Sequence, residues 1–140
     1  MSFAAVRGYF RSRMNGLGHK EHTDAFNWQN IPEKIQNRAY HIETSTGFGN
    51  GQNQTVIDAN QDVTVRLFIL GYRDTGSRID AAIAFADEAI CDIVNPINAN
   101  GTLIKTAKFV SMNVLPRSES NDNTIIVEIN FTARLMIRTV

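Results

Sequence analysis

The sequence has little cysteine, no long hydrophobic run and no excess of charge. Cys91 is the single cysteine among 140 residues, which excludes an internal disulfide and is typical of a reducing compartment. No apolar run approaches the roughly 20 residues of a membrane-spanning helix. The formal net charge is zero, so no overall attraction to nucleic acid or to anionic membranes is expected. Arginines interrupt the apolar positions at the N-terminus, which is not the pattern of a signal peptide.

The composition indicates one globular domain. With 140 residues, of which 43% are hydrophobic, the chain has the size of a typical domain and can remove about two-thirds of its unfolded surface from water. No internal repeat and no linker divides it. We therefore expect a single domain over residues 1–140.

Two segments have the periodicity of amphipathic helices. Residues 3–17 are expected to begin after Ser2 as N-cap and to end at Gly16 or Gly18. Their apolar face consists of Phe3, Val6, Phe10, Met14 and Leu17. Residues 77–95 are expected to begin at a capping box of Ser77 and Asp80 and to end before Pro96. Their buried stripe is expected to consist of Ile79, Ile83, Ala86, Ile90 and Val94.

The two predicted helices carry opposite charge on their outer faces. The first presents Arg7, Arg11 and Arg13 without an acidic partner in its own sequence, and the second presents Asp80, Asp87, Glu88 and Asp92. One interpretation is electrostatic complementarity, in which the arginines meet Asp87, Glu88 and Asp92 of a neighbouring subunit head to tail. The alternative is that both are ordinary solvated faces.

The remaining periodic segments predict strands at 38–44, 54–72 and 102–114, with a short helical turn at 30–34. From Ile125 onward, apolar residues alternate without a break to Ile137, and a strand of that length would run about 45–50 Å. Such a strand either bends or leaves the body of the domain. The fold class is therefore α+β: a mostly antiparallel β-sheet covered by two main helices (3–17 and 77–95), with a long C-terminal β-hairpin.

A glycine-rich stretch lies between the first two predicted strands. Gly47, Gly49 and Gly51 alternate with Phe48 and Asn50. A dinucleotide-binding loop needs a different glycine spacing and a helix after it, whereas a strand follows here. We therefore predict a flexible loop that connects two strands and becomes ordered against a partner.

Candidate catalytic and metal-binding residues are few. His19, Glu21 and His22, with Asp24 and His41 nearby, could contribute to a metal site, but a solvated polar loop is favoured. Cys91 could act as a nucleophile with His41 as base, but its acidic helix disfavours a thiolate, and a buried structural cysteine is favoured. Arg134 and Arg138 could contact phosphates. No catalytic residue, cofactor or metal is assigned, and an enzyme is not expected.

The order of these segments and their local sequences resemble those of a known protein family. An N-terminal helix is followed by the N-I-P element at residues 30–32, the strand NRAYHI (37–42) and the glycine-rich stretch. The strand VTVRLFILGYR (63–73), the helix IDAAIAFADEAICDIV (79–94) and the terminal hairpin complete the pattern. This layout is similar to that of the tail terminator, or tail completion, proteins of long-tailed bacteriophages.

The resemblance implies a structural role in the virion tail or neck, assembled in the host cytoplasm. Such proteins form a homohexameric ring on the tail-tube protein, stop tube polymerisation and contact the head-completion or connector protein. DNA only passes through the lumen, without sequence-specific binding, and no membrane or cofactor is involved. Two alternatives stay open at this point: another head–tail joining ring, such as a connector or stopper, and a small metal-binding enzyme domain.

Overall fold

The fold is α+β, with two helices and five strands in the described part of the chain. The computed structural model describes residues 2–22, 38–70, 75–99, 103–115 and 124–139. The helices are α1 (Phe3–Gly16) and α2 (Thr75–Val94). The strands are β1 (Lys20–Glu21), β2 (Ala39–Gln52), β3 (Val56–Leu70), β4 (Thr106–Leu115) and β5 (Thr124–Arg138). The helical turn predicted at residues 30–34 lies outside the described residues.

Helix α1 has the ends that its sequence predicts. The Ser2 side chain accepts a hydrogen bond from the Ala5 N–H at 3.3 Å, as an N-cap does. At the other end Gly18 has a φ of 89°, a conformation that glycine adopts without strain. The N–H groups of Gly18 and His19 donate to the carbonyls of Asn15 and Met14, which forms a Schellman cap. The last residue of α1 is therefore Gly16, and Gly18 supplies the left-handed residue that closes its C-terminal cap.

The five strands form one mixed sheet in the order β1-β2-β3-β5-β4. The short β1, which was not predicted from the sequence, pairs parallel with β2, and all other neighbouring pairs are antiparallel. Strand β3 pairs with β5 without interruption from Val56 opposite Arg138 to Leu70 opposite Thr124. The long alternating segment is therefore a single strand that lies inside the sheet.

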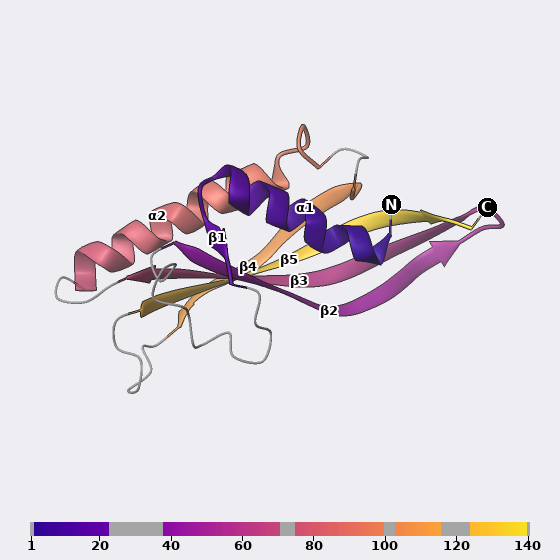
Figure 1. Cartoon of the computed structure of the whole chain (residues 1–140). Coiled ribbons are helices and arrows are strands. Elements are labelled where there is room, and N and C mark those ends of the chain that lie inside the picture. Colours follow the sequence, from indigo (N-terminus) through magenta and orange to yellow (C-terminus); the bar gives the residue numbers. More distant parts are fainter. Residues whose placement is uncertain (1, 23–37, 71–74, 100–102, 116–123, 140) are drawn as a thin grey trace.

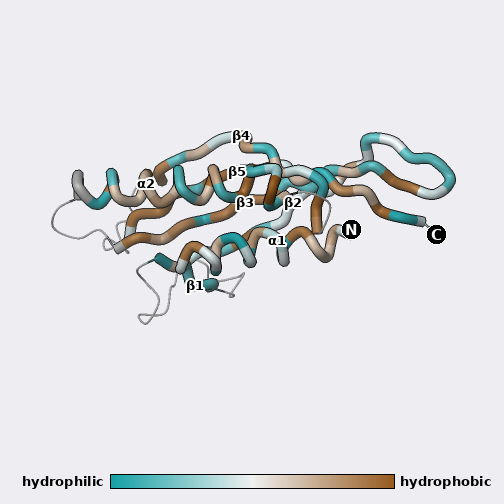
Figure 2. Tube along the Cα trace, turned by 90° about the horizontal axis from the view of Figure 1, so that it is seen from above, coloured by the Kyte–Doolittle hydropathy of each residue, from teal (hydrophilic) through white to brown (hydrophobic). Residues whose placement is uncertain are grey.

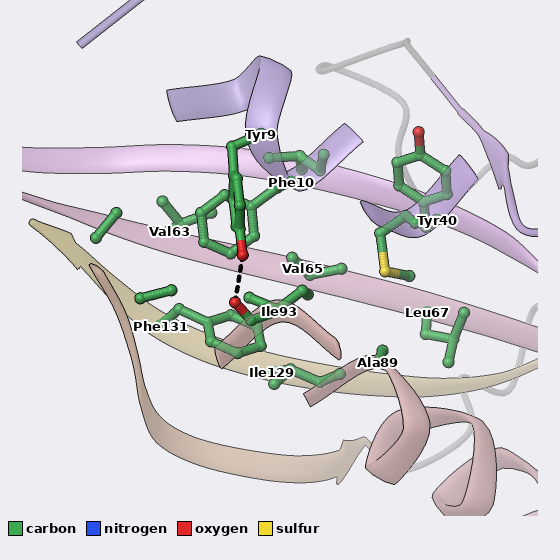
Figure 3. Close-up of a cluster of buried hydrophobic side chains, with 14 of the residues drawn as sticks. Tyr9, Phe10, Tyr40, Val63, Val65, Leu67, Ala89, Ile93, Ile129 and Phe131 are labelled. Carbon is green, nitrogen blue, oxygen red and sulfur yellow. Dashed lines mark hydrogen bonds between the residues drawn. The ribbon is translucent and has the colours of Figure 1, made fainter. Parts of the chain in front are cut away.

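Both helices cover the same face of the sheet (Figure 1). Figure 3 shows Tyr9 and Phe10 of α1 packed over the strands, where the Tyr9 hydroxyl donates a hydrogen bond to the Ile93 carbonyl of α2. The Phe10 ring lies 5.3 Å from the ring of Phe131, measured between centroids. Strand β3 contributes alternate residues to this core, namely Val63, Val65, Leu67 and Ile69, as its pattern predicts.

The buried faces of the helices differ in part from the prediction. On α1, Tyr9 is buried in the core, whereas Phe3 is 39% exposed and Leu17 is only partly buried. On α2 the buried residues are Ala82, Ala86, Ala89 and Ile93. Of the predicted stripe, Ala86 is fully buried, and Ile79, Ile90 and Val94 are partly buried and pack against the core. Helix α2 also begins at Thr75, so the predicted capping box at Ser77 lies inside the helix.

One end of the sheet extends beyond the helices. Residues 48–60 and 134–138, here called the arm, comprise the β2–β3 turn and the strand segments that pair beside it. Figure 1 shows the arm projecting past the start of α1, and Figure 2 shows that its tip is hydrophilic. The rest of the described structure is called the body. Of the long C-terminal strand, only the end at residues 134–138 extends beyond the body, and it does so beside the β2–β3 turn, which was not predicted to leave the domain.

Candidate functional site

The arm exposes an unusually long stretch of backbone and side chains. Every residue from 45 to 55 is exposed, although residues up to Gln52 belong to strand β2. The side chain of Phe48 is 42% exposed and is the only large hydrophobic group in this stretch. A strand with all its residues exposed has no covering layer of its own, so the arm is the first candidate for an interaction site.

The glycine-rich stretch is strand, which corrects the predicted loop. Gly47, Phe48, Gly49, Asn50 and Gly51 lie within β2, most of them in register with β3, and the turn follows at residues 53–55. Register shifts between Thr44 and Gly47 and between Gly49 and Gly51 interrupt the ladder. β-Bulges of this kind are sites where extra residues and glycines are accommodated within a strand. Closely spaced glycines indicate a break in a strand, and only the pairing with β3 extends the strand through them.

The junction between arm and body is closely packed at Gly47. A side-chain carbon at this position would lie 2.8 Å from the Phe3 ring of α1. No atom lies within 4 Å of the corresponding position at Gly49 or Gly51. Only the first of the three glycines is therefore required by close packing, and it marks the point where α1 stops covering the sheet.

Side-chain hydrogen bonds define the tip of the arm. The Asn53 carboxamide oxygen accepts hydrogen bonds from the N–H groups of Thr55 and Val56, both at 2.9 Å. Thr139, which follows β5, donates from its N–H to the Thr55 carbonyl at 2.9 Å and from its hydroxyl to the Gln54 carbonyl at 2.7 Å. The turn is thus held by its own asparagine and by the segment after β5.

The polar face of the arm is internally paired. Arg134 of β5 forms a bidentate pair with Asp58 of β3, with a shortest distance of 2.6 Å. Hydrogen bonding to Arg134 lowers the pKa of the Asp58 carboxyl below its ordinary value. Asn60 donates to Asn50 across the strands at 3.2 Å. Arg134, considered as a phosphate contact from the sequence, is therefore engaged by a carboxylate of its own chain.

A second group of exposed apolar side chains lies on β4, at the edge of the sheet opposite to β2. On β4, Phe109, Val110 and Val114 are 40%, 56% and 38% exposed. A register shift between Phe109 and Ser111 leaves Val110 without a partner on β5. Strand β4 is the last strand of the described sheet on that side. This edge was not recognised as a candidate site in the sequence, because a strand that ends a sheet has the same alternation as one inside it.

The face of the sheet away from the helices carries a polar network. Asn130 of β5 accepts from the Thr64 hydroxyl at 2.7 Å and donates to the Ser111 hydroxyl at 3.0 Å. Arg66 of β3 forms ion pairs with Glu43 at 2.6 Å and with Glu128 at 3.2 Å. A pocket of about 330 Å³ lies beside this network. Its polar lining groups bond largely to one another, so they hold adjacent strands together.

The basic face of α1 is paired within the chain, which corrects the view that it lacks acidic partners. Arg11 forms a bidentate contact with Glu21 of β1, at 2.6 and 3.2 Å, and Arg7 lies 3.6 Å from the same carboxylate. Arg13 contacts Asp92 of α2 at 2.7 Å. Asp87 and Glu88 are exposed on α2 and form no ion pair within the described residues. The arginines therefore do not need a neighbouring subunit for charge compensation.

The histidines lie in buried positions, not in the solvated loop that the sequence favoured. His19 packs edge-on against Phe85 of α2 at 5.7 Å between ring centroids. Burial and the nearby Arg38 guanidinium lower the pKa of His19 to about 4. The ring centroids of His22 and His41 lie 6.5 Å apart. Burial, and to a smaller extent the positive charge of Arg66, lowers the pKa of His41 below its ordinary value.

These histidines do not form a metal centre in the described structure. Within residues 2–22, 38–70, 75–99, 103–115 and 124–139, no three histidine, cysteine or acidic side chains are grouped so as to hold an ion. Glu21 pairs instead with Arg11, and Asp24 lies outside the described residues. The structure therefore brings together only His22 and His41 of the candidate ligands.

Cys91 is exposed, so the prediction of a buried structural cysteine is wrong. It lies on the outer side of α2, the helix that covers one face of the sheet. His41 belongs to the other face, because its neighbours Tyr40 and Ile42 point into the core beneath the helices. The two residues cannot act as a nucleophile and its base.

Comparisons with known proteins leave the family open. No protein-family model matches this sequence, and a search of curated proteins finds none with significant similarity. In the described part of the chain, no helix has both the length and the apolar character needed to cross a membrane. The arm and the edge of β4 are therefore the features of the described structure that point to a function.

Proposed function

We propose that this chain is a structural virion protein, a tail terminator of a long-tailed bacteriophage. Six copies would form a ring on the last ring of the tail tube, stop tube polymerisation and join the tail to the head. The partners would be other copies of the chain, the tail-tube protein and a head-completion or connector protein. DNA would pass through the lumen, and the protein would reside in the tail or neck of the virion.

The observation that carries the proposal is the uncovered arm. Strand β2 is exposed at every residue from 45 to 52, and the arm projects beyond α1, so the described residues leave its surface uncovered. Proteins that form a ring and join two assemblies need contact surfaces between their own copies as well as toward each assembly. The arm at one end of the sheet and the apolar side chains of β4 at its side provide separate surfaces of this kind.

The element order supports the same proposal. Apart from the two-residue β1, the described chain runs helix, two strands, helix, two strands, which is the order on which the resemblance to tail terminators rests. The charge of zero fits a ring that contacts several proteins, because no single charged partner is favoured.

The test is tube capping. Tail tubes polymerising from the tube protein of the same virion are mixed with the purified chain, and tube lengths and ends are measured by negative-stain electron microscopy. We expect short tubes that carry a ring at one end. Tubes that elongate normally, with the protein bound instead to the head vertex, would contradict a terminator and favour a connector or stopper ring.

A further inference from the structure

The described sheet ends in two free edges that differ in character. Strand β1 pairs only with Ala39 and Tyr40, so the rest of β2 forms one edge of the sheet. Strand β4 forms the other edge. An edge strand presents N–H and C=O groups that a strand of another chain can pair with. Each subunit therefore offers two places for strand addition, at opposite sides of the sheet.

The β2 edge lacks the usual protection against strand addition. None of residues 44–57 is charged and none is proline, although charges and prolines are the common means of blocking an exposed edge. The β-bulges give it some irregularity, but its small side chains leave room for a second backbone. An uncharged edge of this length is suited to binding another strand.

The β4 edge has the complementary character. It exposes Phe109, Val110 and Val114, and it carries Lys108 without any acidic residue between Thr106 and Leu115. Pairing of β4 with β4 of another copy would bring lysines together, and pairing of β2 with β2 would cover none of the exposed β4 side chains. Pairing of β2 with β4 avoids the like charges, because β2 carries no charge between Thr44 and Gln52.

The direction of the strands also suits this pairing. Three antiparallel steps lead from β2 through β3 and β5 to β4, so β4 runs antiparallel to β2. A second copy in the same orientation therefore places its β4 antiparallel to β2 of the first. Without a shift, the registers set Thr44 level with Phe109 and Phe48 level with Thr106.

We propose that β2 of one subunit adds to β4 of a second copy, so that neighbouring subunits share a continuous sheet. The inference deepens the ring function proposed above and rests on it. The contact is heterologous, because the donor and acceptor edges are different surfaces, and every copy uses both. Repetition of such a contact builds a ring when the rotation closes.

Disulfide trapping between two singly substituted proteins tests the pairing. Cys91 is exposed and is first replaced in both proteins by Cys91→Ser. One protein then carries Phe48→Cys, and the other carries Thr106→Cys, Lys108→Cys or Val110→Cys. After mild oxidation of the mixture, we expect cross-linked heterodimers from at least one pair and none with Ile97→Cys, an exposed control position that follows α2 and belongs to neither edge strand.

A charge substitution provides an independent measurement. Val110→Lys places a second lysine on the β4 edge and is expected to shift the ring toward monomer in light scattering by at least tenfold in concentration. The matched control, Ile97→Lys, changes an apolar side chain that is 86% exposed and leaves the ring intact. Circular dichroism confirms that both variants are folded.

The outcomes separate this inference from the function on which it rests. A ring that forms without any β2–β4 cross-link and is unaffected by Val110→Lys overturns the edge pairing and leaves the terminator proposal standing. A chain that stays monomeric at all concentrations and does not cap tubes overturns both. Cross-links between two β4 strands would also overturn the pairing, because they require an isologous contact.

Discussion

The body and the arm share strands β2, β3 and β5, but only the body is covered by helices. In the body, β3 buries Val63, Val65 and Leu67 beneath α1 and α2. In the arm, the same strand continues to pair on both sides, yet β2 beside it is exposed at every residue. The backbone hydrogen bonds between the strands thus continue beyond the end of the hydrophobic core.

This difference shows that pairing and burial can be separated along one sheet. Three strands that pair side by side can persist with little burial when they continue a well-packed sheet. The body supplies the stability through buried apolar area, which contributes about 25 cal/mol per Å². The arm adds little of this kind and leaves its surface available for another chain.

The two regions should differ most in how much an aromatic side chain contributes to the free energy of unfolding. Phe10 is fully buried in the body, and Phe10→Ala should lower the free energy of unfolding by about 3–5 kcal/mol. Phe48 is 42% exposed in the arm, and Phe48→Ala should change the free energy of unfolding by no more than about 0.5 kcal/mol. Urea denaturation of both variants measures this. Equal losses would show that the arm contributes to stability as the body does.

Acid should destabilise the body through His19. Its folded pKa of about 4 lies below the ordinary 6.5, so between these values the unfolded chain binds a proton that the folded chain does not. The free energy of unfolding should therefore fall as the pH drops through this window, by at most about 3 kcal/mol. Urea denaturation at several pH values compares the wild type with His19→Phe, which keeps an aromatic ring against Phe85. Parallel pH profiles would contradict the assignment.

The boundary between the regions can be located with two glycine substitutions. Gly47→Val should lower the free energy of unfolding by about 1 kcal/mol, because its side chain would meet Phe3, which is partly exposed and can move. Gly49→Val meets no atom within 4 Å and should be neutral or raise stability by up to about 1 kcal/mol. Thermal unfolding measures both. A reversed order would place the end of the body elsewhere.

The smallest expected effect concerns the contact between the two helices. A double-mutant cycle with Arg13→Ala and Asp92→Ala should give a coupling energy of about 0.2–1 kcal/mol, because the pair is partly exposed. The coupling should be the same at low and high protein concentration, since the contact lies within one chain. A coupling that appears only at concentrations where copies associate would instead place this contact between subunits.

Local patterns in the sequence were sufficient for most of the secondary structure. Helix α1 and strands β3 and β5 carry their periodicity in contiguous residues, and Ser2 and Gly18 are local end signals. The identity of the buried α2 face was not predictable in this way. It depends on which side of the helix packs against the sheet, and this side contains Ala82, Ala89 and Ile93.

The candidate sites depended more strongly on contacts between distant residues. The glycines at 47–51 become strand only because β3 continues beside them, and Arg13 finds Asp92 at a separation of 79 residues. The burial of His19 depends on Phe85 of α2. The sequence identified most of these residues but not the pairing that gives each its environment.

The position of β5 in the sheet has a consequence for the order of folding. Strand β5 lies between β3 and β4, although it is the last of the five strands in the sequence. During synthesis, β3 therefore lacks its partner on one side, and β4 lacks its only described partner, until β5 has left the ribosome. The sheet therefore closes only after β5 has been synthesised, because β5 is the pairing partner of both β3 and β4.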